Sequence, residues 1–131
     1  MPEPKRCLVV DDEPRLRRVL VRLLEGDGFT CREAGSGTEA LALMNQDPAP
    51  LVISDLRMPE MDGVSLLREI IAHWPDTAVI MVTAVAEVES AVACLQLGAL
   101  DYVAKPFHLD EVRARVNQAL DKRRLKLELA G

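Results

Sequence analysis

Five side chains that carry reactive groups each follow a short apolar segment of this 131-residue chain. They are Asp11 and Asp12 after residues 8–10, Asp55 after 51–54, Thr83 after 78–82, and Lys105 after 102–104. Each residue alone has an ordinary structural explanation, such as an acidic helix start, a turn or a solvated charge. Because four apolar segments end in the same way, we interpret the five side chains as one functional site.

The chemistry of such a site follows from its residue types. Three carboxylates in one pocket repel one another, and this repulsion raises their pKa values unless a cation joins them. Mg²⁺ suits the pocket, because it binds one or two carboxylates and leaves positions for a phosphate. Lys105 would balance the charge of one phosphoryl oxygen, and the Thr83 hydroxyl would donate to another. Asp55 is the candidate nucleophile, since a carboxylate ionised at neutral pH needs no general base. The set predicts phosphoryl transfer.

The elements that position these residues alternate along the whole chain. Short apolar runs, typical of strands, are separated by stretches with apolar residues at helical spacing. This alternation predicts an α/β fold, a doubly wound parallel sheet of five strands with five helices on its two faces. The expected strands are 8–10, 29–34, 51–54, 78–82 and 102–104, and the expected helices are 14–25, 36–46, 64–74, 88–97 and 109–120.

The strand order explains which strand lacks a reactive residue. Ligands of open parallel sheets bind outside the carboxyl ends of the strands, where the order reverses. In the order 2-1-3-4-5 the second strand lies at the edge, away from that position. The second strand ends in Ala34-Gly35 and offers no reactive group, whereas the other four carry the candidate residues.

Local patterns define the expected starts and buried faces of some helices. The segment Ser36-Gly37-Thr38-Glu39 is typical of a capping box that opens a helix. Two later helices have apolar stripes that we expect to face the sheet. The stripes are Val64, Leu67, Ile70, Ile71 and Trp74 in one helix, and Val88, Ala91, Val92 and Leu95 in the next.

Composition and charge exclude several classes of protein. The chain is 49% hydrophobic and 28% charged, as expected of a single globular domain. With 3% aromatic residues and a net charge of −5, it is not a general nucleic-acid binder. No apolar run spans a membrane, and residues 1–7 show no targeting segment. Three widely spaced cysteines favour a cytoplasmic protein with reduced thiols.

Four motifs, in this order, resemble the receiver domain of bacterial two-component response regulators. They are Asp11-Asp12, the segment DLRMPEMDG from Asp55 to Gly63, Thr83-Ala84, and Tyr102-x-x-Lys105-Pro106-Phe107. The resemblance covers about residues 5–121, and we place the receiver domain at 1–121. It implies a flavodoxin-like fold, a cytoplasmic location for this protein, and a sensor histidine kinase as its partner.

The resemblance implies a phosphoacceptor and a metal site. Asp55 would accept the phosphoryl group, and Mg²⁺ would be the cofactor. Asp12 would be a direct metal ligand, and Asp11 would act mostly through water or on the other side of the metal. Asp55 and the backbone carbonyl of Arg57 would complete the protein ligands.

The resemblance also implies a switch. Thr83 and Lys105 would hold the phosphoryl group, and Tyr102 would turn inward when Thr83 moves toward the phosphate. The Lys105–Pro106 peptide bond would be cis. The domain would promote its own phosphorylation and dephosphorylation, but it would not be an enzyme with a separate product.

Two other classes of protein fit the residues poorly. A haloacid-dehalogenase-type phosphatase needs a second aspartate two residues after the nucleophile, where this chain has Arg57. A flavodoxin-like FMN binder needs a phosphate-binding loop after the first strand. That strand is followed instead by Asp-Asp-Glu-Pro at 11–14, which would repel a phosphate.

Residues 122–131 form a C-terminal helical extension or the start of a linker. The stretch 121–129 lacks Gly and Pro and is rich in helix formers, so the helix is expected to continue two turns or more beyond the sheet. Leu125 and Leu129 share one helical face. We favour a signalling helix that pairs with a second copy and leads to a transcriptional or nucleotide-signalling effector domain outside this chain.

Other interpretations of the output stay open. A solvated tail is the less favoured alternative for residues 122–131. Residues 111–131 carry six basic and three acidic side chains, which weakly favours contact with DNA or an acidic partner. The protein is alternatively a stand-alone single-domain response regulator that acts through protein contacts. The face formed by the fourth helix, fifth strand and fifth helix is, beside the C-terminal helix, the other candidate surface for a dimer.

Overall fold

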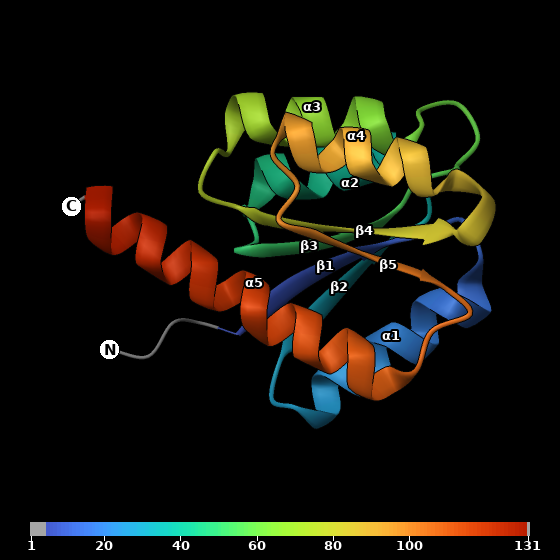
Figure 1. Ribbon diagram of the computed structural model, residues 1–131, viewed down its shortest axis with the longest axis horizontal. Helices are drawn as coiled ribbons and strands as arrows, with labels where there is room; N and C mark the ends of the chain where they lie inside the picture. Colours follow the sequence, from blue (N-terminus) through green and yellow to red (C-terminus); the bar gives the residue numbers. More distant parts are fainter. Residues whose placement is uncertain (1–4, 131) are drawn as a thin grey trace.

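Five parallel strands form one sheet in the computed structural model, which describes residues 5–130. They are β1 (Arg6–Val10), β2 (Thr30–Ala34), β3 (Leu51–Asp55), β4 (Ala78–Ala84) and β5 (Asp101–Lys105). Their order is β2-β1-β3-β4-β5, which confirms the order expected from the sequence (Figure 1). All four pairings are parallel, so the carboxyl ends of the strands share one edge of the sheet.

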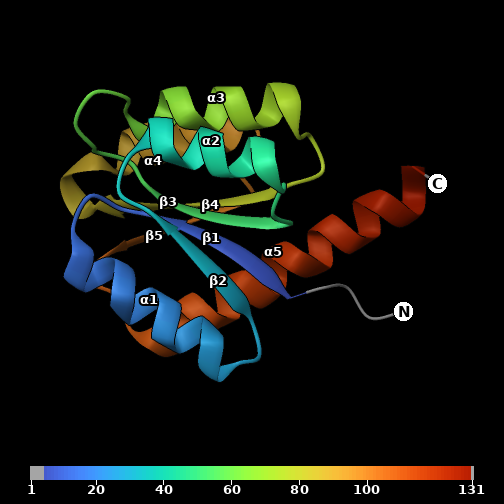
Figure 2. The same ribbon diagram turned by 180° about the vertical axis from the view of Figure 1, so that it is seen from behind.

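Helices cover both faces of the sheet, as the alternating pattern predicts (Figures 1 and 2). One face packs against α1 (Pro14–Gly26) and α5 (Leu109–Ala130). The other packs against α2 (Gly37–Gln46), α3 (Gly63–His73) and α4 (Val88–Leu97). A short 3₁₀ helix, η1 (Val85–Glu87), leads from β4 into α4. Each face has its own apolar core, because the side chains of β1, β3 and β4 alternate between them.

The structure corrects the predicted buried faces of two helices. In α4, Val92 and Leu95 are exposed, and the buried residues are Ala91 and Cys94. In α3, Leu66 is fully buried, although it lies outside the predicted stripe, while Ile71 and Trp74 are only half-buried. The side that faces the sheet in α4 carries small residues, so it is less apolar than the neighbouring side.

The start of α2 follows the predicted cap with one difference. The Ser36 hydroxyl accepts a hydrogen bond from the Glu39 N–H at 3.1 Å. The Glu39 carboxylate accepts from the N–H of Gly35 at 3.3 Å, one residue earlier than in a standard capping box. The first contact satisfies an N–H group that a helix start leaves without a partner, and the second satisfies the N–H of the residue before the N-cap.

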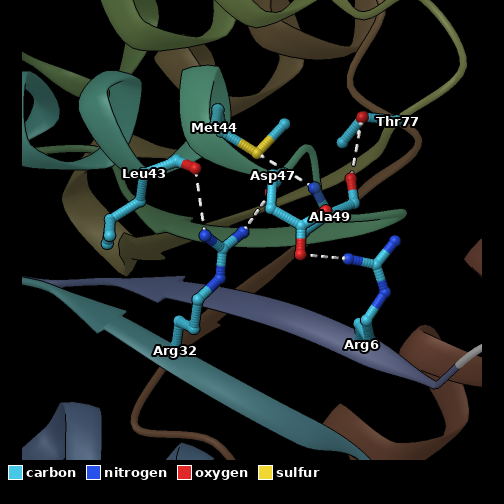
Figure 3. Close-up of polar contacts among 7 residues, drawn as sticks. All are labelled: Arg6, Arg32, Leu43, Met44, Asp47, Ala49 and Thr77. Atoms are coloured by element: carbon cyan, nitrogen blue, oxygen red, sulfur yellow. Dashed lines mark hydrogen bonds and ion pairs between the residues drawn. The ribbon is translucent and has the colours of Figure 1, made fainter.

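The end of α2 is fixed to the sheet by two arginines (Figure 3). Arg32 of β2 donates to the carbonyl oxygens of Leu43, at 3.0 Å, and of Asp47. Arg6 of β1 forms an ion pair with the Asp47 carboxylate at 2.8 Å. Cations at the carbonyl end of a helix offset its unpaired acceptors and its dipole. These contacts fix the turn that leads into β3.

α5 continues past the sheet as one helix to Ala130 (Figures 1 and 2). Three basic side chains of its last part donate to backbone carbonyls: Lys122 to Leu100 at 3.4 Å, Arg123 to Asp76 at 2.7 Å and Lys126 to Pro75 at 2.8 Å. Leu125 and Leu129 are 54% and 88% exposed. The assignment of 122–131 as a separate segment stays a prediction, and residues 1–4 and 131 lie outside the described part.

No helix within residues 5–130 is both long enough and apolar enough to cross a membrane. The thiols of Cys7, Cys31 and Cys94 are free. Cys7 and Cys94 are buried, and Cys31 is half-buried, so all three pack as small apolar side chains.

Candidate functional site

Three carboxylates meet at the carboxyl edge of the sheet. Asp11 and Asp12 directly follow β1, and Asp55 ends β3, its neighbour in the sheet. One carboxylate oxygen of each residue lies within 4.8 Å of those of the other two. Asp11 and Asp55 are 1% and 7% exposed, whereas Asp12 faces solvent. The structure therefore brings together the three acidic residues that the sequence predicts for one site.

Asp11 has one satisfied and one unsatisfied carboxylate oxygen. Its Oδ1 accepts a hydrogen bond from the Glu13 N–H at 2.8 Å. Its Oδ2 is buried without a hydrogen-bond partner among the described residues, and the Lys105 Nζ lies 3.9 Å from it. Burial, together with repulsion from Asp55 and Asp12, raises the pKa of Asp11 from 3.8 to about 6. A buried oxygen in this state is suited to bind a cation.

Asp55 lies beside the only amine that reaches the carboxylates in the described part of the chain. The Lys105 Nζ is 3.4 Å from its Oδ1. Burial raises the pKa of Asp55 above 3.8, and the charge and hydrogen bond of Lys105 oppose that shift. Asp55 thus has a nearby positive charge but does not form a tight ion pair with it.

Gly63 sets how closely α3 approaches Asp55, and the sequence reasoning missed this role. Its N–H donates to the Leu56 carbonyl at 2.8 Å, which closes the loop after β3. A Cβ at Gly63 would collide with the Asp55 carbonyl oxygen and the Leu56 Cα. The Asp62 carboxylate caps α3 by accepting from the Ser65 N–H at 2.9 Å. The pair Asp62-Gly63 is the only sequence signal of this tight junction.

Thr83 and Lys105 lie at the carboxyl ends of β4 and β5, whereas Tyr102 lies near the start of β5, opposite Met81. The Thr83 side chain is fully buried, and its hydroxyl donates to the Ala84 carbonyl at 3.2 Å. Lys105 pairs with Ala84 across the sheet, and the peptide bond that follows it is cis. Tyr102 is half-buried against the core that α2, α3 and α4 share, three residues before Lys105.

One contact at the rim of the site was not predicted. Arg57 is exposed in the loop after β3, and its Nη2 lies 2.7 Å from an oxygen of Glu87. Glu87 is the last residue of η1. The two residues are 30 positions apart, so only the fold brings them together.

The donor set fits a divalent cation. Three carboxylates provide oxygen ligands, and one buried oxygen lacks a hydrogen bond. Mg²⁺ prefers such hard oxygen ligands and retains several waters or phosphate oxygens. The exposure of Asp12 leaves an open side through which a phosphate can approach.

The sequence matches the family model described as the response regulator receiver domain over residues 7–117. The chain therefore belongs to the receiver domain family of response regulators. Among curated proteins, the regulatory protein AtoC of Escherichia coli K12 is 45% identical over 124 residues, covering 95% of this chain and 27% of AtoC. The C4-dicarboxylate transport transcriptional regulatory protein DctD of Rhizobium meliloti is 44% identical over 120 residues. The match covers 92% of this chain and 26% of DctD. The chain spans about a quarter of these relatives.

Solved structures show the same fold. The structure of NtrX from Brucella abortus matches with a TM-score of 0.93 and 32% identity over 98% of this chain and 29% of NtrX. The isolated receiver domain of NtrX matches with a TM-score of 0.85 and 33% identity, covering 88% of this chain and 98% of that domain.

Proposed function

We propose that this receiver domain takes a phosphoryl group from a phosphohistidine of a sensor histidine kinase onto Asp55, with Mg²⁺ as cofactor. The observation that carries the proposal is the cluster at Asp55. Two further carboxylates and the Lys105 amine surround it, and the buried Asp11 Oδ2 lacks a hydrogen bond. Such a cluster has no evident structural purpose, because it places like charges together and buries two of them.

The proposed reaction is a direct displacement at phosphorus. A carboxylate oxygen of Asp55 attacks the phosphorus atom of the phosphohistidine. The new P–O bond forms as the P–N bond breaks, and the electron pair of the broken bond stays on the imidazole nitrogen. Small donors such as acetyl phosphate are expected to substitute for the kinase, since Ala84 is exposed and leaves the entrance open.

Residues of the site have separate proposed roles. Asp12, Asp11, Asp55 and the Arg57 carbonyl would hold the metal ion. When bound, Mg²⁺ would neutralise charge on the transferring phosphoryl group.

Two further residues would hold the phosphoryl group, and a third would change its orientation in response. Lys105 already lies at hydrogen-bond distance from Asp55, so it would bind a phosphoryl oxygen on that residue. The Thr83 hydroxyl would leave the Ala84 carbonyl to donate to another phosphoryl oxygen. Tyr102 would then turn inward. The domain would promote its own phosphorylation and dephosphorylation without converting a separate substrate.

The output proposed for this domain is control of an effector domain elsewhere in a longer protein. The relatives AtoC and DctD are regulatory proteins about four times as long as the matched region, and DctD is named as a transcriptional regulator. A stand-alone regulator that acts through protein contacts is the alternative.

Phosphate incorporation tests the proposal. Wild-type protein with Mg²⁺ and acetyl phosphate is expected to gain one acid-labile, hydroxylamine-sensitive phosphate, measured by intact mass. Asp55→Asn is expected to gain none, because the amide is a poor nucleophile of nearly the same shape. Asp62→Asn is the matched control, since Asn caps α3 as well as Asp does, and it should be phosphorylated normally. Phosphate on Asp55→Asn would reject the assignment.

A further inference from the structure

An ion pair joins the two loops that border the carboxylate site. The Arg57 guanidinium, in the loop after β3, donates to the Glu87 carboxylate at 2.7 Å. Arg57 lies two residues after Asp55, and Glu87 directly precedes α4. The ion pair therefore connects the loop of the proposed phosphoacceptor with the start of α4.

In the described part of the chain, Glu87 is ion-paired, whereas the next acidic residue along the chain, Glu89, is not. Glu87 occupies the N-cap position of α4, but its side chain caps no N–H group, so its carboxylate serves Arg57 instead. Glu89 lies in the first turn of α4, is exposed, and has no polar partner among residues 5–130. Glu87 and Glu89 thus form a matched pair of acidic residues, of which only one is ion-paired.

A second contact fixes the other end of the same segment. The Thr83 hydroxyl donates to the carbonyl of Ala84, the residue just before η1. A hydroxyl has a single proton to donate, so Thr83 must leave this carbonyl before it can donate to a phosphoryl oxygen. In the unphosphorylated arrangement, segment 84–87 is therefore held by Thr83 at one end and by Arg57 at the other.

We propose that Glu87 is a positioning residue whose ion pair with Arg57 holds segment 84–87 in the unphosphorylated arrangement. This inference rests on the proposed phosphorylation of Asp55. A phosphoryl group on Asp55 adds negative charge two residues before Arg57 in the chain. That charge competes with the Glu87 carboxylate for the guanidinium, because phosphate and carboxylate bind guanidinium in the same way. Release of Glu87 then frees segment 84–87 as the Thr83 hydroxyl turns toward the phosphoryl group.

The affinity for beryllofluoride, a stable mimic of the phosphoryl group, tests whether the ion pair opposes phosphorylation. With Mg²⁺ present, Glu87→Gln is expected to bind beryllofluoride about two- to fivefold more tightly than wild type in a fluorine NMR titration, as loss of an exposed ion pair predicts. The gain should shrink toward onefold in ~1 M salt, which screens exposed charges. Glu89→Gln removes the same charge without breaking an ion pair, so its affinity should stay within about 1.5-fold of wild type.

A double-mutant cycle isolates the ion pair from other effects of charge. In an Arg57→Gln background, Glu87→Gln is expected to change the affinity by less than about 1.5-fold, because its partner is already gone. A gain that persists in this background, or that Glu89→Gln reproduces, overturns the proposal.

Amide hydrogen exchange of the unphosphorylated protein gives a readout that needs no phosphoryl group. We expect faster exchange at residues 84–90 in Glu87→Gln than in Glu89→Gln. Equal exchange in the two variants also overturns the proposal. Failure of the proposed function would look different, since the wild-type protein would then take up no phosphate on Asp55.

Discussion

The Asp11 carboxylate is the one that is most costly to ionise when no metal ion is bound. Its carboxylate is buried, one oxygen has no hydrogen-bond partner among the described residues, and two other carboxylates lie close by. These surroundings favour the protonated form, which explains the rise of its pKa to about 6. At neutral pH the folded protein therefore bears the cost of an ionised, poorly compensated group. Binding of a cation would remove that cost.

We expect Asp11→Asn to stabilise the metal-free protein by about 1–3 kcal/mol at pH 8, because the pKa rise from 3.8 to about 6 measures the cost of ionising Asp11 in the fold. Between these two values the folded state binds more protons than the unfolded state, so the free energy of unfolding of the wild type falls as pH rises. The stabilising effect should therefore shrink from pH 8 to pH 4. Urea unfolding with a chelator at both pH values measures it.

The exposed Asp76 provides the control for net charge. Asp76→Asn removes the same charge far from the cluster and should change the free energy of unfolding by less than about 0.5 kcal/mol at either pH. A stabilisation by Asp11→Asn that is equal at pH 4 and pH 8 would contradict the assigned cause.

At the scale of elements, the junction of β3 and α3 depends on the absence of a side chain. The loop after Asp55 folds back so far that the Gly63 N–H donates to the Leu56 carbonyl, and α3 starts against the backbone of Asp55 and Leu56. A methyl group at Gly63 has no free space there. Position 63 thus fixes both the start of α3 and the backbone of Asp55.

Gly63→Ala is expected to destabilise the domain by about 1–3 kcal/mol, because the added methyl group forces backbone atoms apart. It should also slow phosphorylation by acetyl phosphate, since the displaced backbone carries Asp55. Gly26→Ala at the end of α1 is the matched control, because nothing lies within 4 Å of its added Cβ. Thermal unfolding and phosphate incorporation measure both variants. If Gly63→Ala behaves like Gly26→Ala, the junction does not depend on the missing Cβ.

The elements differ in how far sequence predicts them. The five strands and their order follow from apolar runs and from the one strand end that lacks a reactive residue. The buried face of α4 does not, because periodicity favours the apolar Val92 and Leu95, whereas the contact with the sheet is made by Ala91 and Cys94. Close packing selects small side chains there, and a hydrophobic pattern carries no information about available space.

In the candidate site, too, some features can be predicted from the sequence and others cannot. Asp11, Asp12 and Asp55 can be predicted to meet, because the ends of neighbouring parallel strands meet in any such fold. The contact of Arg57 with Glu87 cannot, since it depends on the path of two loops. The unpaired oxygen of Asp11 is likewise a property of the packed structure alone.

At the scale of the whole molecule, the last part of α5 is both anchored and exposed. Arg123 and Lys126 donate to carbonyls of the turn between α3 and β4, which directs the helix along that side of the domain. Leu125 and Leu129 remain exposed. Lys122, Arg123 and Lys126 thus already donate hydrogen bonds to acceptors within the domain. These are basic side chains that a DNA or acidic partner would contact. An exposed pair of leucines favours a second copy of the helix as partner.

Removal of residues 122–131 is expected to leave phosphorylation of Asp55 unchanged and to weaken self-association, because the deletion removes both leucines but no residue of the site. The double substitution Leu125→Ser with Leu129→Ser should have the same effect on association while it keeps the anchoring contacts. Sedimentation velocity, with and without beryllofluoride, measures association. The same association state in all three proteins would rule out pairing through this helix.

α5 is one unbroken helix from Leu109 to Ala130, so each of its residues has a fixed rotation about the helix axis. Each residue of an α-helix turns the chain by about 100° and advances it by about 1.5 Å. In a longer protein, a domain joined rigidly to α5 would therefore point in a direction set by the number of residues between them. Insertion of one residue after Ala119 would rotate that domain by about 100°, whereas insertion of seven would nearly restore its direction, about 10 Å farther away. Spacing along the helix, as much as its composition, would then decide whether two such domains can meet.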